Sequence, residues 1–307
     1  MPMSGKSFDV QGNIFRKPHG GMYGASGMNS IPGTAMDTAP IPQGSLDPII
    51  KKHLSGTSDK KDAGSSQWGS YAQIDDMREP FQGFPVGIIC IKLDYPKIPG
   101  NVVNATTFPF PVVYEVLDFE IERLFEGDPS LEQLVLDAAK KLESSGVKVI
   151  VGACGYFAHF QQSVANHVGV PVFMSSLCQL PVIRLGLRKD ARIGVLCANG
   201  ENLSDAILSQ IGETSHNLII ADVSKIDSFA PIRWGKDVLD NVALSRDLGT
   251  LSAEMRRRNP DMEAILLEFS DLPPYAYDIQ QACGLPVFDF ITMIEWVAKS
   301  VTQNRYL

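Results

Sequence analysis

The sequence predicts an α/β fold of two duplicated parallel-sheet lobes, with the functional site in the cleft between them. Two observations carry this prediction. Short, nearly continuous apolar runs alternate with segments of helical period, which is typical of strands buried on both faces of a parallel sheet. In addition, two segments of the chain match each other without gaps at an offset of 115 residues.

An N-terminal extension precedes this pattern. Residues 1–84 hold 12 of the 26 glycines and long polar runs, and no helical or strand period persists there. Such a composition buries too little apolar surface to offset the entropy of ordering the chain. We interpret residues 1–84 as a Gly/Ser/Pro-rich tail or strap outside the folded core, with a partner-binding arm as the alternative.

The first lobe is predicted to span residues 85–183. It opens with a buried strand at 85–93, followed by a loop at 94–112 whose four prolines exclude a regular helix or central strand. A helix is expected at 130–146, with Ser130 as its cap and Gly146 at its end. Three further elements follow: a strand at 147–155, a helix at 156–168 and a strand at 170–176.

The second lobe is predicted to span residues 184–289. Its expected strands are 191–200, 217–223, 262–268 and 285–290, and its expected helices are 245–258 and 272–282. A final helix runs to about residue 300, and we assign the segment 290–307 to the first lobe, which it would complete.

The internal repeat places residues 147–173 on residues 262–288. Ile150 falls on Ile265, Pro171 on Pro286 and Phe173 on Phe288, and GIIC at 87–90 weakly resembles GVLC at 194–197. Because strand–helix–strand units share patterns, a chance match is the alternative to a duplication. Ligands of open α/β sheets bind beyond the carboxyl ends of the strands. Two facing lobes would therefore bring two equivalent strand ends, at Cys154 and Phe269, to one cleft.

Composition excludes several classes of partner. Lys and Arg number 27 against 35 Asp and Glu, a net charge of −8, which argues against nucleic acid or an anionic membrane. No apolar run approaches the roughly 18 residues of a membrane span, and the N-terminus lacks the apolar core of a signal peptide. We therefore expect a cytoplasmic protein with no nucleic-acid or membrane partner.

The five cysteines form neither a disulfide framework nor a zinc motif, since no CxxC pair occurs. Cys154 stands out because it follows a predicted strand at the start of a helix. Backbone N–H groups there, including those of Gly155 and Tyr156, favour a thiolate and could seat a substrate carboxylate. The alternative is a small buried residue in a tight turn. Packing roles are expected for the other four: Cys90, Cys178, Cys197 and Cys283.

Several motifs in order resemble the aspartate/glutamate racemase superfamily. They are the opening strand with its PGNVVNATTFPFPV loop, GACGYFAHFQ, VPVFMSS, LLEFSDLPPYA and the closing GLPVFDFITMIEWV. This superfamily includes hydantoin racemases, arylmalonate decarboxylases, maleate isomerases and algal dimethylsulfoniopropionate lyases. The resemblance covers about residues 85–300.

The resemblance implies a homo-oligomeric enzyme that needs no pyridoxal phosphate, metal or other cofactor. Two cysteines, one per lobe, would flank the substrate α-carbon, one thiolate removing a proton and the opposite thiol returning one. The first cysteine corresponds to Cys154, but the second position holds Phe269, which cannot donate a proton. Phe269 is interpreted as the wall of a remodelled pocket, with lost activity or an engineered change as alternatives. Dimethylsulfoniopropionate lyases keep both cysteines, so Phe269 also counts against that assignment.

Further substrate-binding candidates lie at loop positions and strand ends. Asn104, Thr106 and Thr107 lie on the proline-rich loop, which covers the site in relatives, and turn formation is their alternative role. Ser175 and Ser176 end a strand, and Ser270 starts a helix that it could simply cap, as could Asp271. His159 lies one turn beyond Cys154 and could support a thiolate, although a packing histidine is the preferred interpretation.

The predicted function is cofactor-independent chemistry at the carbon α to a carboxylate of an amino acid or small carboxylic acid. An amino-acid racemase-type isomerase is the first expectation. A lyase or decarboxylase of the same fold and an inactive carboxylate-binding homologue are the alternatives. A nucleotide-dependent oxidoreductase is disfavoured because no GxGxxG follows any predicted strand.

Overall fold

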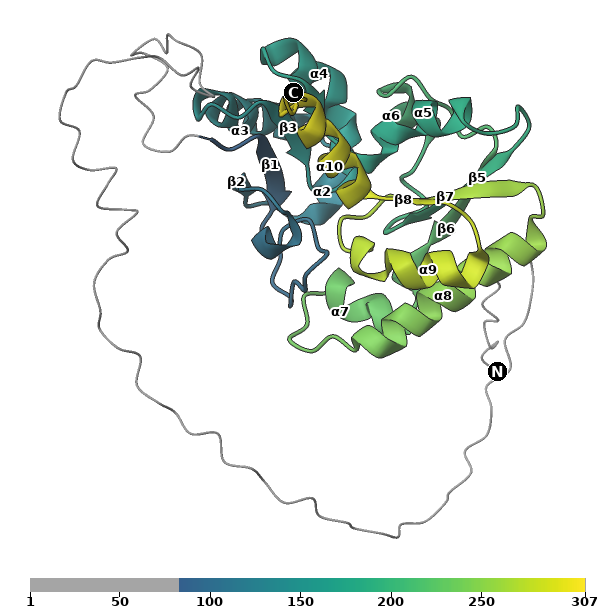
Figure 1. Cartoon of the computed structure of the whole chain (residues 1–307). Helices are drawn as coiled ribbons and strands as arrows, with labels where there is room; N and C mark the ends of the chain where they lie inside the picture. The colour runs from purple at the N-terminus through teal and green to yellow at the C-terminus, as the bar shows by residue number, and fades with distance from the viewer. Residues whose placement is uncertain (1–82, 307) are drawn as a thin grey trace, which may run out of the picture. The chain divides into compact units, whose positions relative to one another are not determined.

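A computed structural model describes residues 83–306 of the chain (Figure 1). The predictions made for the N-terminal extension fall almost wholly outside these described residues. The described residues belong to one compact unit.

Two four-stranded sheets form the centre of the molecule, and the fold-class prediction is confirmed. In the first sheet the order is β2 (Val112–Leu117), β1 (Val86–Ile91), β3 (Val149–Gly152) and β4 (Val172–Phe173). In the second the order is β6 (Leu218–Asp222), β5 (Arg192–Cys197), β7 (Met262–Leu267) and β8 (Val287–Phe288). Every neighbouring pair is parallel.

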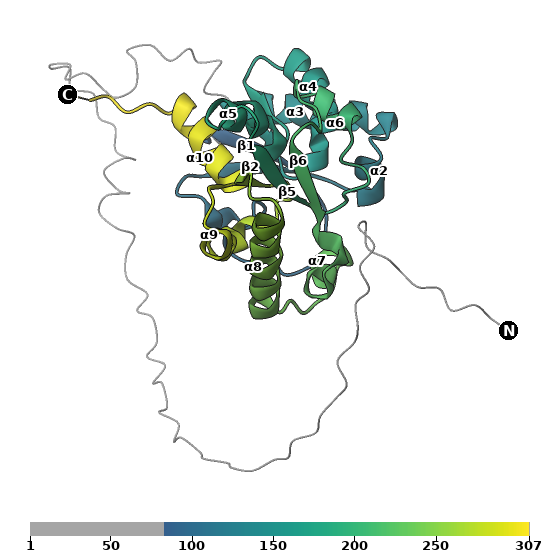
Figure 2. The ribbon, with the colours of Figure 1, turned by 90° about the vertical axis from the view of Figure 1, so that its right-hand side faces the viewer.

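Helices connect the strands and cover the sheets (Figures 1 and 2). They are α2 (Ile121–Phe125), α3 (Glu132–Ser144), α4 (Gln161–His167), α5 (Leu180–Leu185), α6 (Asp205–Ser209), α7 (Ala230–Arg233), α8 (Asn241–Arg258), α9 (Ala276–Cys283) and α10 (Phe290–Val301). Short 3₁₀ turns join several of them, among them η4 (Gly155–Phe160), η5 (Ser176–Gln179) and η8 (Pro273–Tyr275). Within residues 83–306 no helix combines the length and the apolar composition that crossing a bilayer requires.

The strand order supports the duplication inferred from the repeat. Adding 115 to the bounds of β3 and β4 gives strand positions that lie in β7 and β8, and α4 falls on α9 in the same way. β1 and β5, which carry the weaker match, each occupy the same inner position between their neighbours. The two lobes therefore share one topology as well as a sequence pattern.

The first sheet is covered on both faces because the residues of β1 alternate in direction. Val86, Ile88 and Cys90 pack in one cluster with Phe290, Met293, Ile294 and Val297 of α10. Ile89 and Ile91 face the other side, where the apolar stripe of α3 lies. The helix at the end of the described chain thus packs on the first sheet, after the chain has passed through the whole second lobe.

One hydrophobic cluster runs through both lobes. It joins Phe125 and Tyr156 of the first lobe to strand residues of the second, including Leu196 and Leu267. In the second lobe α8 packs along α9, and a Cβ added at Gly249 would lie at ordinary van der Waals distance from Ala282. The shared core holds the two sets of strand ends in a fixed relation.

Several elements differ from the expectations. β2 and the short helices α2, α5, α6 and α7 were not predicted. β2 is an edge strand of half-buried residues that begins directly after Pro111, so its apolar signal is weak. Ser130 does not cap α3, which begins at Glu132. Instead the carboxylate of Asp128 accepts the N–H of Ser130 and caps the preceding 3₁₀ turn.

Candidate active site

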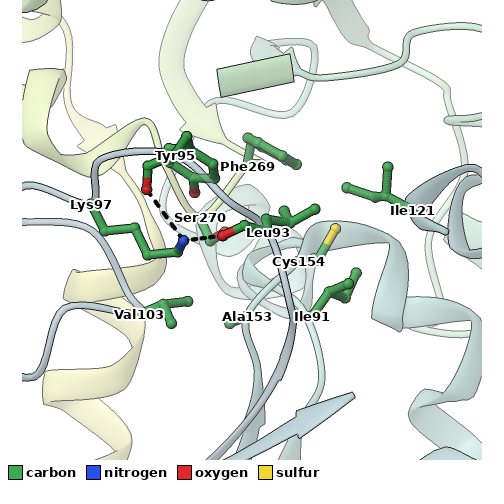
Figure 3. Close-up of a pocket in the computed structure, with 10 residues that line it drawn as sticks. All are labelled: Ile91, Leu93, Tyr95, Lys97, Val103, Ile121, Ala153, Cys154, Phe269 and Ser270. Carbon is green, nitrogen blue, oxygen red and sulfur yellow. Dashed lines mark hydrogen bonds between the residues drawn. The ribbon is translucent and has the colours of Figure 1, made fainter. Parts of the chain in front are cut away.

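A small cavity lies where the strand ends of the two lobes meet. It is lined by Ile91, Leu93, Tyr95, Lys97, Val103, Ile121, Ala153, Cys154, Phe269 and Ser270 (Figure 3). Its volume is about 10 Å³, enough for roughly one water molecule. The lining comes from the end of β1 and the loop after it, from the segments that follow β3 and β7, and from α2.

Cys154 and Phe269 line this cavity together, as the repeat predicted. Each lies two residues after the end of its strand, β3 or β7, and each is almost fully buried, with 2% and 3% exposure. Figure 3 shows both side chains directed into the same space. The phenyl ring of Phe269 packs edge-to-face against Phe229 at 5.9 Å between centroids, which fixes its position.

The thiol of Cys154 is held in its neutral form. Burial raises the pKa of Cys154 well above its ordinary value, and the nearby carboxylates of Glu268 and Asp271 raise the pKa further. The N–H of Tyr156 at the start of η4 lowers the pKa, as the sequence predicted, but it is outweighed. A thiolate at Cys154 therefore needs a positive charge nearby or a partner that accepts its proton.

Glu268 is a functional candidate that sequence reasoning missed. Its side chain is fully buried, and its Oε1 atom has no hydrogen-bond partner. Its Oε2 atom accepts the N–H of Ala198 at 3.4 Å. Burial raises the pKa of this carboxyl to about 8. The sequence contained a sign of this role, because Glu268 ends the apolar run MEAILLE. A glutamate at the end of a buried strand rarely serves packing alone.

A buried polar network ties the loop after β1 to the end of β7. The side chain of Asp271 accepts hydrogen bonds from the hydroxyl of Tyr95 and the amide of Asn101. The Ser270 hydroxyl also donates to it, at 3.5 Å. Neither Ser270 nor Asp271 caps α9, so that interpretation was wrong. Burial raises the pKa of Asp271, while these donors lower it.

Lys97 is the one charged residue among those lining the cavity. Its ammonium group donates to the carbonyls of Leu93 and Tyr95 and lies 4.2 Å from the centroid of the Tyr95 ring (Figure 3). The loop thus folds back on itself and brings a cation to the site.

The other substrate-binding candidates on this loop form hydrogen bonds that hold the loop's own backbone in place. Asn104 donates to the Lys97 carbonyl at 2.9 Å and accepts from Thr106. Thr107 donates to the Asn101 carbonyl at 2.8 Å and accepts the N–H of Gly100. None of Asn104, Thr106 and Thr107 lines the cavity. A substrate role for them stays a prediction.

Of the two strand-end serines, Ser176 joins the two lobes. Ser175 accepts the N–H of Leu177, and Ser176 donates to the carbonyls of Leu267 at 3.0 Å and Glu268 at 3.2 Å. Both serines are fully buried. Of the remaining predicted substrate-binding residues, Ser270 alone lines the cavity.

Gly155 and Tyr156 lie directly behind Cys154. A Cβ at Gly155 would overlap the carboxylate of Glu268, so the present position of that carboxylate depends on the glycine. The Tyr156 hydroxyl donates to the carbonyl of Asn199 in the second lobe, and its ring meets Phe125 at 4.7 Å. Neither residue lines the cavity, and both contact the second lobe, through Glu268 and Asn199.

The remaining titratable candidates have packing roles. Cys90 and Cys197 are fully buried in apolar clusters, and Cys178 donates to the side chain of Gln161 at 3.3 Å. His159 lies against Gly127, and burial lowers its pKa. It is not among the groups that shift the pKa of Cys154. Among the described residues no group of three or more His, Cys, Asp or Glu side chains is arranged to hold a metal ion.

Comparison with known proteins gives the family. No protein-family model matches the sequence. "Dimethylsulfoniopropionate lyase 7" of Emiliania huxleyi is 32% identical over 231 residues, which cover 71% of this chain and 67% of that protein. The chain belongs to the dimethylsulfoniopropionate lyase family.

Other members of the family differ in length. "Dimethylsulfoniopropionate lyase 3" of E. huxleyi is 33% identical over 233 residues, and the chain spans 60% of its length. "Dimethylsulfoniopropionate lyase" of Durusdinium sp. clade D is 27% identical over 267 residues, which cover 84% of this chain and 88% of that protein.

Solved structures of similar fold include unliganded arylmalonate decarboxylase, at 18% identity and a TM-score of 0.49, covering 72% of this chain and 94% of that one. An aspartate racemase homologue from Pyrococcus horikoshii OT3 matches at 16% identity and a TM-score of 0.47, covering 71% of this chain and 99% of that one.

Proposed function

We propose that this member of the family is a cofactor-independent lyase. It removes the α-proton of a small carboxylate that carries a sulfonium group on the neighbouring carbon, with Cys154 as the base. The names of its relatives support a lyase over the racemase that the sequence first suggested. The observation that carries the proposal is the 32–33% identity to named dimethylsulfoniopropionate lyases, which outweighs the expectation that Phe269 counts against this assignment.

Racemisation needs a base on one face of the α-carbon and a proton donor on the other, whereas elimination needs only the base. A racemase must return a proton to the opposite face of the α-carbon, and Phe269 cannot supply it. In an elimination the electron pair of the broken C–H bond forms a double bond instead, and the sulfonium leaves as a neutral sulfide that needs no proton. A site with Cys154 alone is therefore sufficient for this chemistry.

The other cavity residues suit such a substrate. The ammonium of Lys97 can pair with the carboxylate, and the rings of Tyr95 and Phe269 can face the sulfonium, since cations bind over aromatic faces. A sulfonium beside Cys154 would also lower the pKa of its thiol, which burial has raised. Because the cavity holds only about 10 Å³, the loop of residues 92–111 must move to admit a substrate.

The test is a product assay on the full chain. With dimethylsulfoniopropionate supplied, we expect dimethyl sulfide, measured by gas chromatography, and one equivalent of acrylate. Parallel incubations of aspartate and glutamate in deuterated water measure α-proton exchange and racemisation. Racemisation at ordinary enzyme rates without sulfide release would overturn the proposal in favour of an isomerase, and no turnover of any substrate would favour a binding protein.

A further inference from the structure

The proposed elimination poses a problem that a racemisation does not. A racemase returns its proton to the substrate, whereas an elimination leaves one extra proton on the enzyme in every turnover. Cys154 is 2% exposed and the cavity has room for about one water molecule, so the thiol has little contact with bulk water while the loop of residues 92–111 covers the site. A second group must take this proton from Cys154.

We propose that Glu268 is that group: it accepts the proton of Cys154 and passes it toward solvent through the second lobe. This inference rests on the proposed function and adds a residue that acts through Cys154 rather than on the substrate, since Glu268 does not line the cavity.

Geometry supports the pairing. The carboxylate of Glu268 lies against Gly155, the residue that directly follows Cys154, and the absence of a Cβ there allows the approach. The backbone of Glu268 is fixed on both sides, because its N–H donates to Leu196 at 2.9 Å and its carbonyl accepts from Ser176 at 3.2 Å. The Oε1 atom has no partner although it is fully buried, so it is free to take a proton.

Burial and a nearby carboxylate favour the protonated, neutral form of Glu268. Burial and the carboxylate of Asp222 raise its pKa to about 8, while the Ala198 N–H lowers it. The other titratable groups that feel its charge are Cys154, Cys197 and Tyr156, and the pKa of each is raised. A proton carrier works best when its pKa is near the working pH.

Asp222 lies on the proposed path of the proton from Glu268 to solvent. It ends β6 and is partly exposed, and its carboxylate accepts the N–H of Gly200 at 3.2 Å and lies 3.7 Å from the ammonium of Lys225. Its charge raises the pKa of Glu268, and the strand that it ends, β6, is the edge strand of the second sheet.

The Cys154 proton moves to Glu268, which leaves a thiolate and a neutral carboxylic acid. The thiolate takes the α-proton, the C–H electron pair becomes the carbon–carbon double bond, and the carbon–sulfur bond breaks with its pair on the departing sulfide. The thiol is then restored, and Glu268 releases its proton to solvent. The net products are the unsaturated carboxylate, the sulfide and one proton.

The experiment compares the full chain with its Glu268→Gln and Glu268→Asp variants, with Glu263→Gln as the matched control. Glu263 lies on β7, the strand that Glu268 directly follows, but it bonds to Arg188 at the surface. We expect Glu268→Gln to lower kcat by about 10²–10⁴, Glu268→Asp to retain part of it, and Glu263→Gln to match the natural chain. A small external base such as imidazole should partly restore Glu268→Gln, which it would not do for a merely structural defect.

A second readout does not depend on turnover. The rate of Cys154 alkylation by iodoacetamide is followed against pH, and Glu268→Gln should move its midpoint to lower pH, because a negative charge near the thiol is gone. An unchanged kcat and an unchanged alkylation profile would overturn the inference. A shifted alkylation profile in a chain that releases no sulfide would instead support the Cys154–Glu268 pair and overturn the proposed function.

Discussion

Cys154 is the residue on which the proposed chemistry depends. Cys154→Ser should lower turnover by about 10²–10⁴, because a hydroxyl is a far weaker acid than a thiol and offers almost no anion near neutral pH. The fold should stay intact, as judged by circular dichroism and thermal unfolding. Cys283→Ser is the control, since Cys283 lies at the end of α9, away from the cavity. A fully active Cys154→Ser variant would remove this residue from the mechanism.

Phe269 determines which reaction the site can perform. Phe269→Cys should enlarge the cavity and place a proton donor opposite Cys154, so it should create or raise racemisation of a small carboxylate such as aspartate or glutamate. Loss of optical rotation together with single deuterium incorporation measures the effect. Phe269→Leu enlarges the cavity without adding a donor and should not racemise. Equal activity in the two variants would show that volume alone matters.

Glu268 should also impose a pH dependence on stability. Its pKa is about 8 in the fold, against a usual 4.5, so the folded chain binds more protons than the unfolded chain between these values. The free energy of unfolding should therefore fall as pH rises from about 4.5 to about 8, by a few kcal/mol at roughly 1.4 kcal/mol per pKa unit. Urea unfolding of Glu268→Gln at pH 5 and pH 8 should show a much smaller decrease, and parallel decreases in both proteins would contradict this assignment.

At the scale of elements, the loop after β1 depends on one buried carboxylate. Tyr95→Phe removes the hydroxyl that donates to Asp271, leaving that buried group with fewer donors. We expect a loss of roughly 1–3 kcal/mol in the free energy of unfolding and a higher KM, because Lys97 is carried by the same loop. Tyr277→Phe, at a site 70% exposed, is the control and should change neither. A loss confined to stability would separate the loop from substrate binding.

The elements differ in how far sequence predicts them. The inner strands β1, β3, β5 and β7 were all predicted, because each is a nearly continuous apolar run in which most residues are buried. The edge strand β2 and the short helices were missed, since half-buried residues carry a weak pattern. Within the site, the repeat predicted that Cys154 and Phe269 share one cavity. The sequence could not assign Glu268 or Lys97 to the site. Their positions depend on how distant segments of the chain pack, which brings Glu268 against Gly155 and Lys97 into the cavity lining.

At the scale of the whole molecule, the N-terminal extension should be dispensable. A chain that begins at Pro80 should stay soluble, unfold cooperatively and keep its activity, because the composition of residues 1–79 cannot offset the entropy of ordering them. Calorimetry and the sulfide assay on the shortened chain test this. Aggregation or a large drop in Tm would show that the extension covers an apolar surface.

The position of α10 sets the order in which the molecule can be completed during synthesis. The face of the first sheet that includes Ile88 and Val151 is covered by Phe290 and Met293. The ribosome makes these helix residues only after the entire second lobe. Until then a row of aliphatic side chains on the nascent first lobe faces water, where it can bind a chaperone or another unfinished chain. Closure of that face therefore waits for α10, and a chain halted before α10 should be degraded rather than accumulate.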